Sequence, residues 1–315
     1  QVRRIIVEKG RATGVEMIDG TKLTAANEVV LSSGAIGSPR LLQLSGIGPA
    51  DHLAGLGIDV VYDQPQVGAN LQDHLDLYCI CEVSGPHTYD RFAKPHLSLL
   101  AGLQYLFTRK GPVASSLFET GGFWYADPNA RSPDIQMHLG LGTGIESGVA
   151  AMQDGGVTLN ACYLRPRSRG SVRLQSADPS VAPAIDPNYL ADPNDRRNSI
   201  EGLKLTQRIM AQKPLQPFIK AERLPGPDVK TDEEYFNFIC EHSKTSHHAA
   251  GTCRMGIDPA APLDTQLRFN GIEGLRVADN SIMPTVISSN TNAAAIMIGE
   301  KASDMIKAQY GMGSS

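Results

Sequence analysis

The sequence lacks a long apolar run, and none of its apolar stretches approaches the roughly 18 residues that a membrane-spanning helix needs. It also lacks a large excess of one charge, because 29 Lys and Arg residues stand against 33 Asp and Glu residues. The resulting net charge of −4 argues against a nucleic-acid partner bound through phosphate contacts. With 315 residues, 41% of them hydrophobic, the chain is long enough for a substantial core, in one large domain or two smaller ones.

Cysteine is scarce and scattered along the chain. The odd number argues against a disulfide framework, and Cys79-Ile80-Cys81 lacks both the spacing and the second ligand pair of a zinc site. We therefore expect reduced thiols and an intracellular, cytoplasmic protein. The five cysteines are Cys79, Cys81, Cys162, Cys240 and Cys253.

Several catalytic and nucleotide-binding motifs are also missing. No GxSxG turn is present, which argues against a serine hydrolase, and there is no P-loop. The GxGxxG turn of a dinucleotide-binding domain is absent too, because no helix pattern follows Gly142-Thr143-Gly144. The chain begins at Gln1 and runs directly into a strand-like segment, without a cap, tag or targeting signal. We expect it to be the C-terminal portion of a longer protein.

Local patterns predict a mixture of strands and helices. Apolar or alternating runs bounded by turn residues predict strands at residues 2–7, 12–18, 28–31, 134–141, 156–164, 170–174 and 275–278. Apolar residues at helical spacing predict helices at residues 50–56, 97–107, 198–210, 232–241 and 293–308. A further helix is expected to begin at Pro39, with Ser38 as its cap, and to end at Leu44.

His248 is the first candidate for chemistry. It follows His247 and precedes a run of small residues at 249–252, which allow a flat ligand or another backbone to approach closely. An imidazole suits proton abstraction near neutral pH, although a lone histidine is also common in purely structural settings. No HExxH spacing and no nearby His or Cys cluster accompany it, so we expect no metal.

Asn290 is the second candidate, because it lies at the entrance of the last predicted helix. A helix N-terminus offers unpaired N–H groups and about half a positive charge, which stabilise an anion or a polarised carbonyl. The structural alternative is that Asn290 or Asn292 simply caps this helix. A histidine on a Gly-rich turn and an asparagine at a helix entrance are together suited to handle a proton.

These segments occur in the order found in one flavoprotein family. The chain resembles the glucose–methanol–choline (GMC) oxidoreductases over essentially its whole length, and most closely their choline-dehydrogenase-like, alcohol-oxidising branch. The matching segments are residues 34–48, 67–74, 164–172, 185–189, 248–256 and 275–306.

The resemblance implies a role for each candidate. His248 matches the active-site histidine of the family, and Asn290 matches the second active-site position, which is His or Asn among its members. The implied reaction is oxidation of an alcohol to a carbonyl, with hydride transfer to N5 of FAD. His248 would accept the hydroxyl proton, and Asn290 would orient the alcohol. Oxygen or a quinone-type acceptor would then reoxidise the flavin.

Four further residues match cofactor-binding positions of the family. Asp279 and Asn280 match a strand end whose backbone approaches the flavin phosphate chain, although a small residue is usual where Asn280 stands. The backbone N–H of Asn292 would face the C2 carbonyl of the isoalloxazine, and Val2 would lie near the adenine. The family's N-terminal part, with its GxGxxG turn, has no counterpart in this sequence.

The expected fold is therefore mixed α/β, with two parts. Residues 1–75 and 241–315 would form part of a Rossmann-like FAD-binding domain, and residues 76–240 an antiparallel-sheet substrate-binding domain. Phe123, Trp124 and His138 are candidates to line the alcohol pocket. Two alternatives stay open: a fragment or subunit that needs a separate N-terminal FAD-binding part, and a non-redox relative of the hydroxynitrile lyase type.

Overall fold

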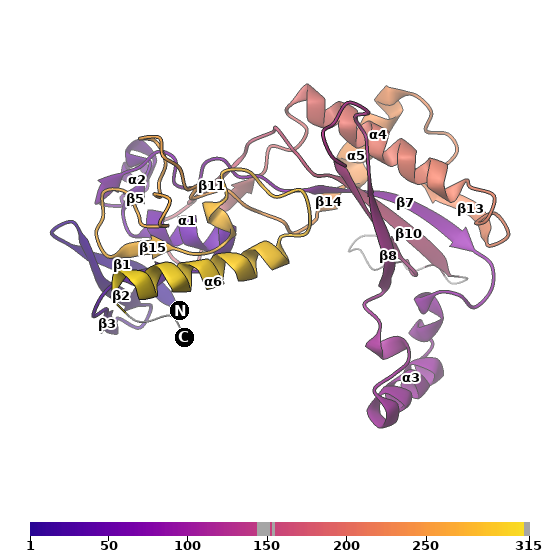
Figure 1. Cartoon of the computed structure of the whole chain (residues 1–315), viewed down its shortest axis with the longest axis horizontal. Helices are drawn as coiled ribbons and strands as arrows, with labels where there is room; N and C mark the ends of the chain where they lie inside the picture. Colours follow the sequence, from indigo (N-terminus) through magenta and orange to yellow (C-terminus); the bar gives the residue numbers. More distant parts are fainter. Residues whose placement is uncertain (144–151, 153–154, 312–315) are drawn as a thin grey trace. The chain divides into compact units, whose positions relative to one another are not determined.

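The computed structural model describes residues 1–143, 152 and 155–311. These residues alternate between helices and strands, which confirms the predicted mixed α/β fold (Figure 1). The chain divides into two compact units. Among the described residues, no helix combines the length and the apolar character that a membrane crossing requires. The first unit is Gln1–His74, Arg165–Asp192 and His247–Ser315, and the second is Leu75–Leu164 and Pro193–Ser246.

The compact units differ from the predicted ranges in one long segment and in two short ones, because residue 75 and residues 241–246 belong to the second unit. Residues 165–192, expected in the substrate-binding part, belong to the first unit. The physical reason is hydrogen bonding to the helix and loop near the N-terminus. The Gln43 amide donates to the Val172 carbonyl (3.0 Å), and Val172 N–H donates to the Gly68 carbonyl (2.7 Å).

The strands of the first unit form several small sheets. Antiparallel strands β1, β2 and β3 make a three-stranded sheet, whereas β4 and β15 form a parallel pair with Val277 opposite Leu31. The pairs β5–β6 and β11–β12 complete the set described for this unit. The strands are β1 (Val2–Glu8), β2 (Arg11–Met17), β3 (Lys22–Thr24), β4 (Val29–Leu31), β5 (Ile47–Gly48), β6 (Tyr62–Asp63), β11 (Ser171–Arg173), β12 (Ala184–Asp186) and β15 (Leu275–Val277).

The predicted start of the first helix is wrong. Helix α1 (Gly34–Leu44) begins five residues before Pro39, which lies inside it, and Ser33 rather than Ser38 is its N-cap residue. A proline inside a helix cannot donate to the carbonyl four residues earlier, here that of Ala35. The Thr252 hydroxyl donates to this carbonyl instead (2.6 Å), so the acceptor that Pro39 leaves without its helical partner is satisfied from another segment.

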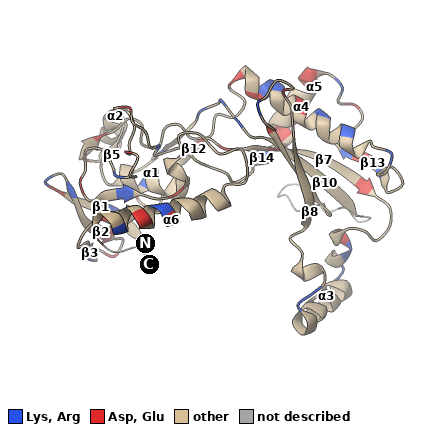
Figure 2. Ribbon diagram, in the orientation of Figure 1, with Lys and Arg blue, Asp and Glu red and all other residues tan. Residues whose placement is uncertain are grey.

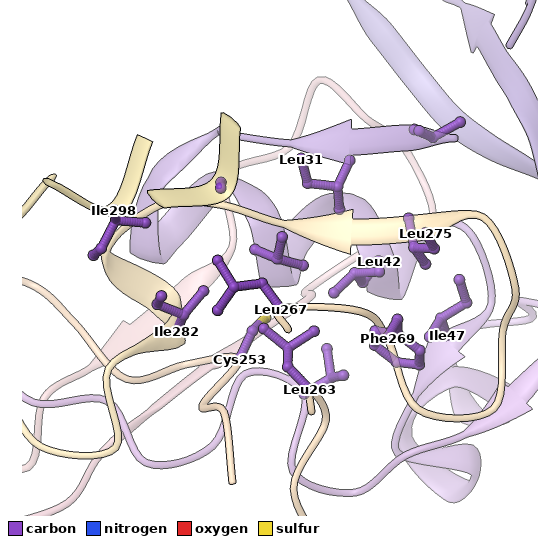
Figure 3. Packing of buried hydrophobic residues seen from close by; sticks show 14 of the residues in the cluster. Leu31, Leu42, Ile47, Cys253, Leu263, Leu267, Phe269, Leu275, Ile282 and Ile298 are labelled. Atoms are coloured by element: carbon purple, nitrogen blue, oxygen red, sulfur yellow. The ribbon is translucent and has the colours of Figure 1, made fainter. Parts of the chain in front are cut away.

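A single apolar core lies beneath the parallel strands of the first unit. Leu31 and Leu275 point from β4 and β15 toward Leu42 of α1, and Cys253 and Leu263 from the adjoining loop pack beside them (Figure 3). The core also contains Ile282 and Ile298, which come from the segment after β15. This packing holds the loop around Cys253 and the last helix to one scaffold. The remaining helices of this unit are α2 (Ala50–Gly55), η3 (Asn280–Ile282) and α6 (Asn292–Gln309).

The second unit is built on an antiparallel sheet with strand order β13-β7-β10-β9-β8, and β14 also pairs with β7. Helix α4 packs on β7 and β10, and α5 begins with a capping box between Thr231 and Glu234. The strands are β7 (Leu75–Val83), β8 (Phe118–Trp124), β9 (Ile135–Gly140), β10 (Gly156–Tyr163), β13 (Ile219–Leu224) and β14 (Lys244–Thr245). The helices are η1 (Tyr89–Ala93), α3 (Pro95–Thr108), η2 (Pro112–Ala114), α4 (Pro193–Met210) and α5 (Asp232–His242).

Candidate active site

Three segments of the first unit are joined by backbone hydrogen bonds around His248. Gln72 and Ala250 exchange two of them, at 3.0 and 2.9 Å. Cys253 N–H donates to the Ser281 carbonyl (2.8 Å), and Gly251 N–H donates to the Asn280 carbonyl (3.2 Å). Residues far apart in the sequence are therefore held in fixed register beside the histidine.

The backbone conformation on either side of His248 is restrained by a hydrogen bond and by a close approach at Gly251. His247 has a φ of 60°, in the left-handed region that few non-glycine residues occupy. The next N–H, that of His248, donates to Oδ1 of Asp73 (2.8 Å). Gly251 has a φ of 91°, and a Cβ there would lie 2.6 Å from the Asn70 carbonyl oxygen. Only glycine fits this close approach without a shift of the backbone.

The structure brings the two sequence-predicted active-site residues together. His248 Nε2 lies 3.3 Å from the side-chain Nδ2 of Asn290. The imidazole is 7% exposed, whereas Asn290 is exposed. This contact joins the Gly-rich turn to the entrance of α6.

The other nitrogen of the imidazole meets a residue to which the sequence assigned no role. Nδ1 of His248 lies 2.9 Å from Nδ1 of His74, and the two rings meet edge to face. His74 is fully buried. Asp73 Oδ1 accepts the His74 N–H (2.9 Å), and Tyr189 donates its hydroxyl to Asp73 Oδ2 (2.5 Å). The residues missed by sequence reasoning are thus Asp73, His74 and Tyr189.

Asp279 has its carboxylate turned into the protein. Oδ2 accepts the Gly34 N–H (3.0 Å) and the Ser38 hydroxyl (2.5 Å), and Oδ1 accepts the Ser281 N–H (2.8 Å). A carboxylate at the N-terminus of α1 is favourable because it meets the positive end of the helix dipole. The side chain therefore ties the end of β15 to α1, and what remains for a ligand at this position is the backbone.

The side chains of the two residues that follow Asp279 are hydrogen-bonded differently from its carboxylate. Within the described structure, the buried Oδ1 of Asn280 has no hydrogen-bond partner. The hydroxyl of the adjacent Ser281 is fully buried and is hydrogen-bonded to the Cys253 thiol. An unpaired buried oxygen is costly, so Asn280, which the sequence singled out, indicates a site for a polar ligand.

The entrance of α6 also suits an electron-rich group. Its first turn has no acidic residue, and Thr291, the N-cap residue, makes no side-chain capping hydrogen bond. Asn292 is the first residue of the helix and is exposed. The charged residues of α6 gather toward its C-terminal end (Figure 2): Glu300, Lys301, Asp304 and Lys307. The N-terminal half is left with its backbone N–H groups and the positive end of its dipole.

The remaining predicted residues are Val2 in the first unit and three side chains in the second unit. Val2 is the first residue of β1, where it is half-buried opposite Met17. In the second unit, His138 lies on β9, and Phe123 and Trp124 are exposed by 47% and 58% on β8. Trp124 lines a pocket of about 500 Å³, together with Glu201 and Arg208. Among the described residues, no group of three or more His, Cys, Asp or Glu side chains is arranged to hold a metal ion.

Comparison with known families and curated proteins gives consistent matches along the chain. The N-terminal and C-terminal GMC oxidoreductase models match residues 1–76 and 166–299. The chain is 40% identical over 310 residues to an oxygen-dependent choline dehydrogenase of Rhizobium rhizogenes, covering 96% of this chain and 56% of that protein. It is 42% identical over 312 residues to the protein of that name from Brucella ovis, with the same coverage of 96% and 56%. The chain thus spans little more than half the length of these relatives.

Solved structures give the same result. A pyridoxine 4-oxidase from "Mesorbium loti" aligns with a TM-score of 0.84 at 29% identity, covering 100% of this chain and 58% of that one. A formate oxidase of Aspergillus oryzae, studied for modification of its FAD, aligns with a TM-score of 0.92 at 27% identity, covering 98% and 60%. With two matching family models and relatives of about 40% identity along nearly all of its length, the chain belongs to the GMC oxidoreductase family.

Proposed function

We propose that this chain is part of an FAD-dependent enzyme that oxidises an alcohol to a carbonyl compound, and that it contains the residues that accept the hydroxyl proton. The single observation that carries the proposal is the contact of His248 Nε2 with Asn290 Nδ2, 3.3 Å apart, next to the entrance of α6. The relatives named oxygen-dependent choline dehydrogenase make choline and similar amino alcohols the first substrates to test. Phe123, Trp124 and His138 remain candidates for the alcohol pocket.

Residues of the first unit are suited to contact FAD. The unpartnered Oδ1 of Asn280 would meet a polar group of the cofactor, and the uncapped entrance of α6 would face the electron-rich edge of the flavin at Asn292. Asp279 would shape this strand end through its contacts with α1. Val2 is proposed to lie near the adenine.

The chemistry of the chain's own residues is proton transfer and orientation. FAD, when bound, supplies the acceptor for the hydride that leaves the alcohol carbon. His248 would accept the hydroxyl proton at Nε2, which makes the loss of that hydride easier. Asn290 would donate its amide hydrogen to the alcohol oxygen and hold the hydroxyl in line with Nε2. The N-terminus of α6 would stabilise negative charge that develops beside it.

The second unit is proposed to be the substrate-binding part. Support comes from a row of polar side chains across its sheet, where Asn160 of β10 lies directly opposite Tyr78 of β7 and His138 of β9. Residues paired in this way share one face of a sheet. His138 is half-buried and is the member of this row nearest to the solvent, because Tyr78 and Asn160 are only 1% and 2% exposed.

The test is anaerobic mixing of the FAD-loaded protein with choline and with a panel of primary alcohols, followed by flavin absorbance. Loss of the oxidised flavin band with formation of the aldehyde supports the proposal. A flavin that stays oxidised while the protein releases cyanide from a cyanohydrin would support the lyase alternative instead. Reoxidation by oxygen or by a soluble quinone then identifies the electron acceptor.

Retention of FAD is measured first, because the chain spans 56% of its curated relatives. If the chain alone retains no FAD but does so when co-expressed with the N-terminal part of a relative, the same mixing experiment is made on that complex. That outcome supports the alternative of a subunit that needs a separate N-terminal part.

A further inference from the structure

We propose that His74 is a positioning residue that sets the tautomer of His248. It accepts a hydrogen bond from Nδ1–H of His248 and so keeps the lone pair of His248 on Nε2. The inference deepens the proposed alcohol oxidation and rests on it for its functional consequence. The tautomer itself is a property of the chain that can be measured without any substrate.

The tautomer follows from one contact at each nitrogen of the His248 ring. Asn290 Nδ2 has hydrogens and no lone pair, so at 3.3 Å it can only donate, and His248 Nε2 must accept. A neutral imidazole that accepts at Nε2 carries its proton on Nδ1. Nδ1 lies 2.9 Å from Nδ1 of His74, and one proton is shared along that line. His74 therefore accepts at Nδ1 and carries its own proton on Nε2.

The chain holds His74 where this hydrogen bond is enforced. One carboxylate oxygen, Asp73 Oδ1, accepts the backbone N–H groups of both His74 (2.9 Å) and His248 (2.8 Å). Tyr189 donates to the other oxygen of Asp73 at 2.5 Å. The rings meet at an interplanar angle of 86°, with His74 at 0% exposure. Bulk solvent therefore does not reach His74, and the backbone anchors fix the distance between the rings.

The arrangement matters because the two nitrogens of His248 then have different tasks. With a proton on Nδ1, Nε2 carries a lone pair, and it can take the proton of a substrate hydroxyl once the Asn290 amide hydrogen turns from Nε2 to the alcohol oxygen. In the reaction, the O–H bond of the alcohol breaks, a new N–H bond forms at Nε2, and His248 becomes an imidazolium. That cation still donates from Nδ1 to the neutral His74, and a hydrogen bond from a charged donor is stronger than one from a neutral donor.

Two variants of His74 separate this hydrogen bond from simple packing. In His74→Asn, a side-chain polar atom occupies the position of Nδ1, and its carbonyl can accept from His248. In His74→Phe, the ring volume is kept, but the acceptor is lost. We expect H74F to slow flavin reduction by an alcohol about 10- to 100-fold, a part of the roughly 10²–10⁴-fold that a positioned base contributes. H74N should stay within about threefold of wild type, and the apparent Kd for the alcohol should change little in either variant.

The decisive readout is ¹⁵N NMR of the histidine side chains, assigned by comparison with a His248→Gln sample. We expect a protonated, pyrrole-type Nδ1 and an unprotonated Nε2 for neutral His248 in the wild type and in H74N, and a mixture of tautomers in H74F. A wild-type His248 protonated on Nε2 would overturn the proposal, even if alcohols reduce the flavin. So would H74N and H74F variants that lose activity equally, because packing alone would then explain the effect. If H74F does not fold, the wild-type tautomer and H74N still decide the question.

Discussion

Asn290 and His74 contact the two nitrogens of the His248 ring, and Asn290 is the partner of Nε2. Because Asn290 donates to Nε2, its replacement removes both the partner that marks this nitrogen as the acceptor and the group proposed to hold the alcohol oxygen. Asn290 is exposed, whereas His74, the partner of the other ring nitrogen, is fully buried. Asn290 should therefore matter more for the reaction than for the stability of the fold.

We expect Asn290→Ala to lower the rate constant of flavin reduction by about 10²-fold, as is typical when one preorganised donor is removed. The free energy of unfolding should change by less than about 0.5 kcal/mol, because the side chain is exposed. Stopped-flow absorbance and urea unfolding measure the two quantities. The neighbour Ser289→Ala is the control, and an equal loss in both variants would contradict the role of Asn290.

For single residues, the sequence predicted some members of the candidate site and did not predict others. His248 and Asn290 stood out because each lies beside a recognisable local pattern, a Gly-rich turn and a helix entrance. His74 has no such pattern, and its meaning comes from a ring 174 positions away in the sequence. Asp73 and Tyr189 act through a carboxylate that bridges separate loops, so local spacing could not indicate them.

Among the elements, α1 depends on a hydrogen bond from outside the helix. Pro39 deprives the Ala35 carbonyl of its helical donor, and the buried hydroxyl of Thr252 supplies one at 2.6 Å. Thr252 is followed by Cys253, whose N–H bonds the Ser281 carbonyl. One loop thus stabilises both α1 and the segment that leads to Asn290.

We expect Thr252→Val, which keeps the side-chain shape, to lower the free energy of unfolding by about 1–3 kcal/mol, because a buried carbonyl is left unpaired. In a Pro39→Ala background, residue 39 regains an N–H that can bond the Ala35 carbonyl, so the cost of Thr252→Val should shrink. Urea unfolding of the two single variants and the double variant measures this coupling. Strictly additive effects would contradict the proposed link.

Helices and strands were predicted well where the pattern was regular, as for α5 with its capping box and for β10. Pro39 misled the prediction because proline favours the first turn of a helix, and the compensating Thr252 is distant in sequence. Strand β7 was not predicted because nearly all of its residues are buried, so it shows no alternation of polar and apolar side chains.

At the scale of the whole molecule, one ion pair offers a clear test of acid stability. Arg254 contacts both carboxylate oxygens of Asp258, at 2.7 and 2.8 Å. The side-chain hydrogen bond from Arg254 lowers the pKa of Asp258 from its ordinary 3.8 to about 2. Because the folded-state pKa lies below the unfolded one, the stabilisation is fully present above about pH 4 and is lost as the pH falls toward 2.

We therefore expect Asp258→Asn to have a lower Tm than wild type at pH 6, and the difference to narrow as the pH falls below about 4. Asp304→Asn, at an exposed site on α6, is the control and should show a smaller difference at each pH. Thermal unfolding followed by circular dichroism measures the effect. A Tm difference between wild type and D258N that widens at low pH would contradict the assignment.

The division of the chain into units was only partly foreseen. Residues 165–192 join the first unit through contacts such as that between Gln43 and Val172, which connect positions 129 apart. No composition change marks where the chain leaves one unit and returns to the other. Hydrogen bonds between distant segments decide this, and a single sequence does not reveal them.

The central claim is that His248 takes the hydroxyl proton of an alcohol. It is tested most directly by the rate of flavin reduction in His248→Ala of the FAD-loaded protein, mixed anaerobically with the best alcohol substrate. His247→Asn is the matched control, because Asn tolerates the left-handed backbone at this adjacent, exposed position. We predict that H248A reduces its flavin at least about 10²-fold more slowly than wild type, with H247N near the wild-type rate. An unchanged rate of flavin bleaching in H248A would contradict the claim.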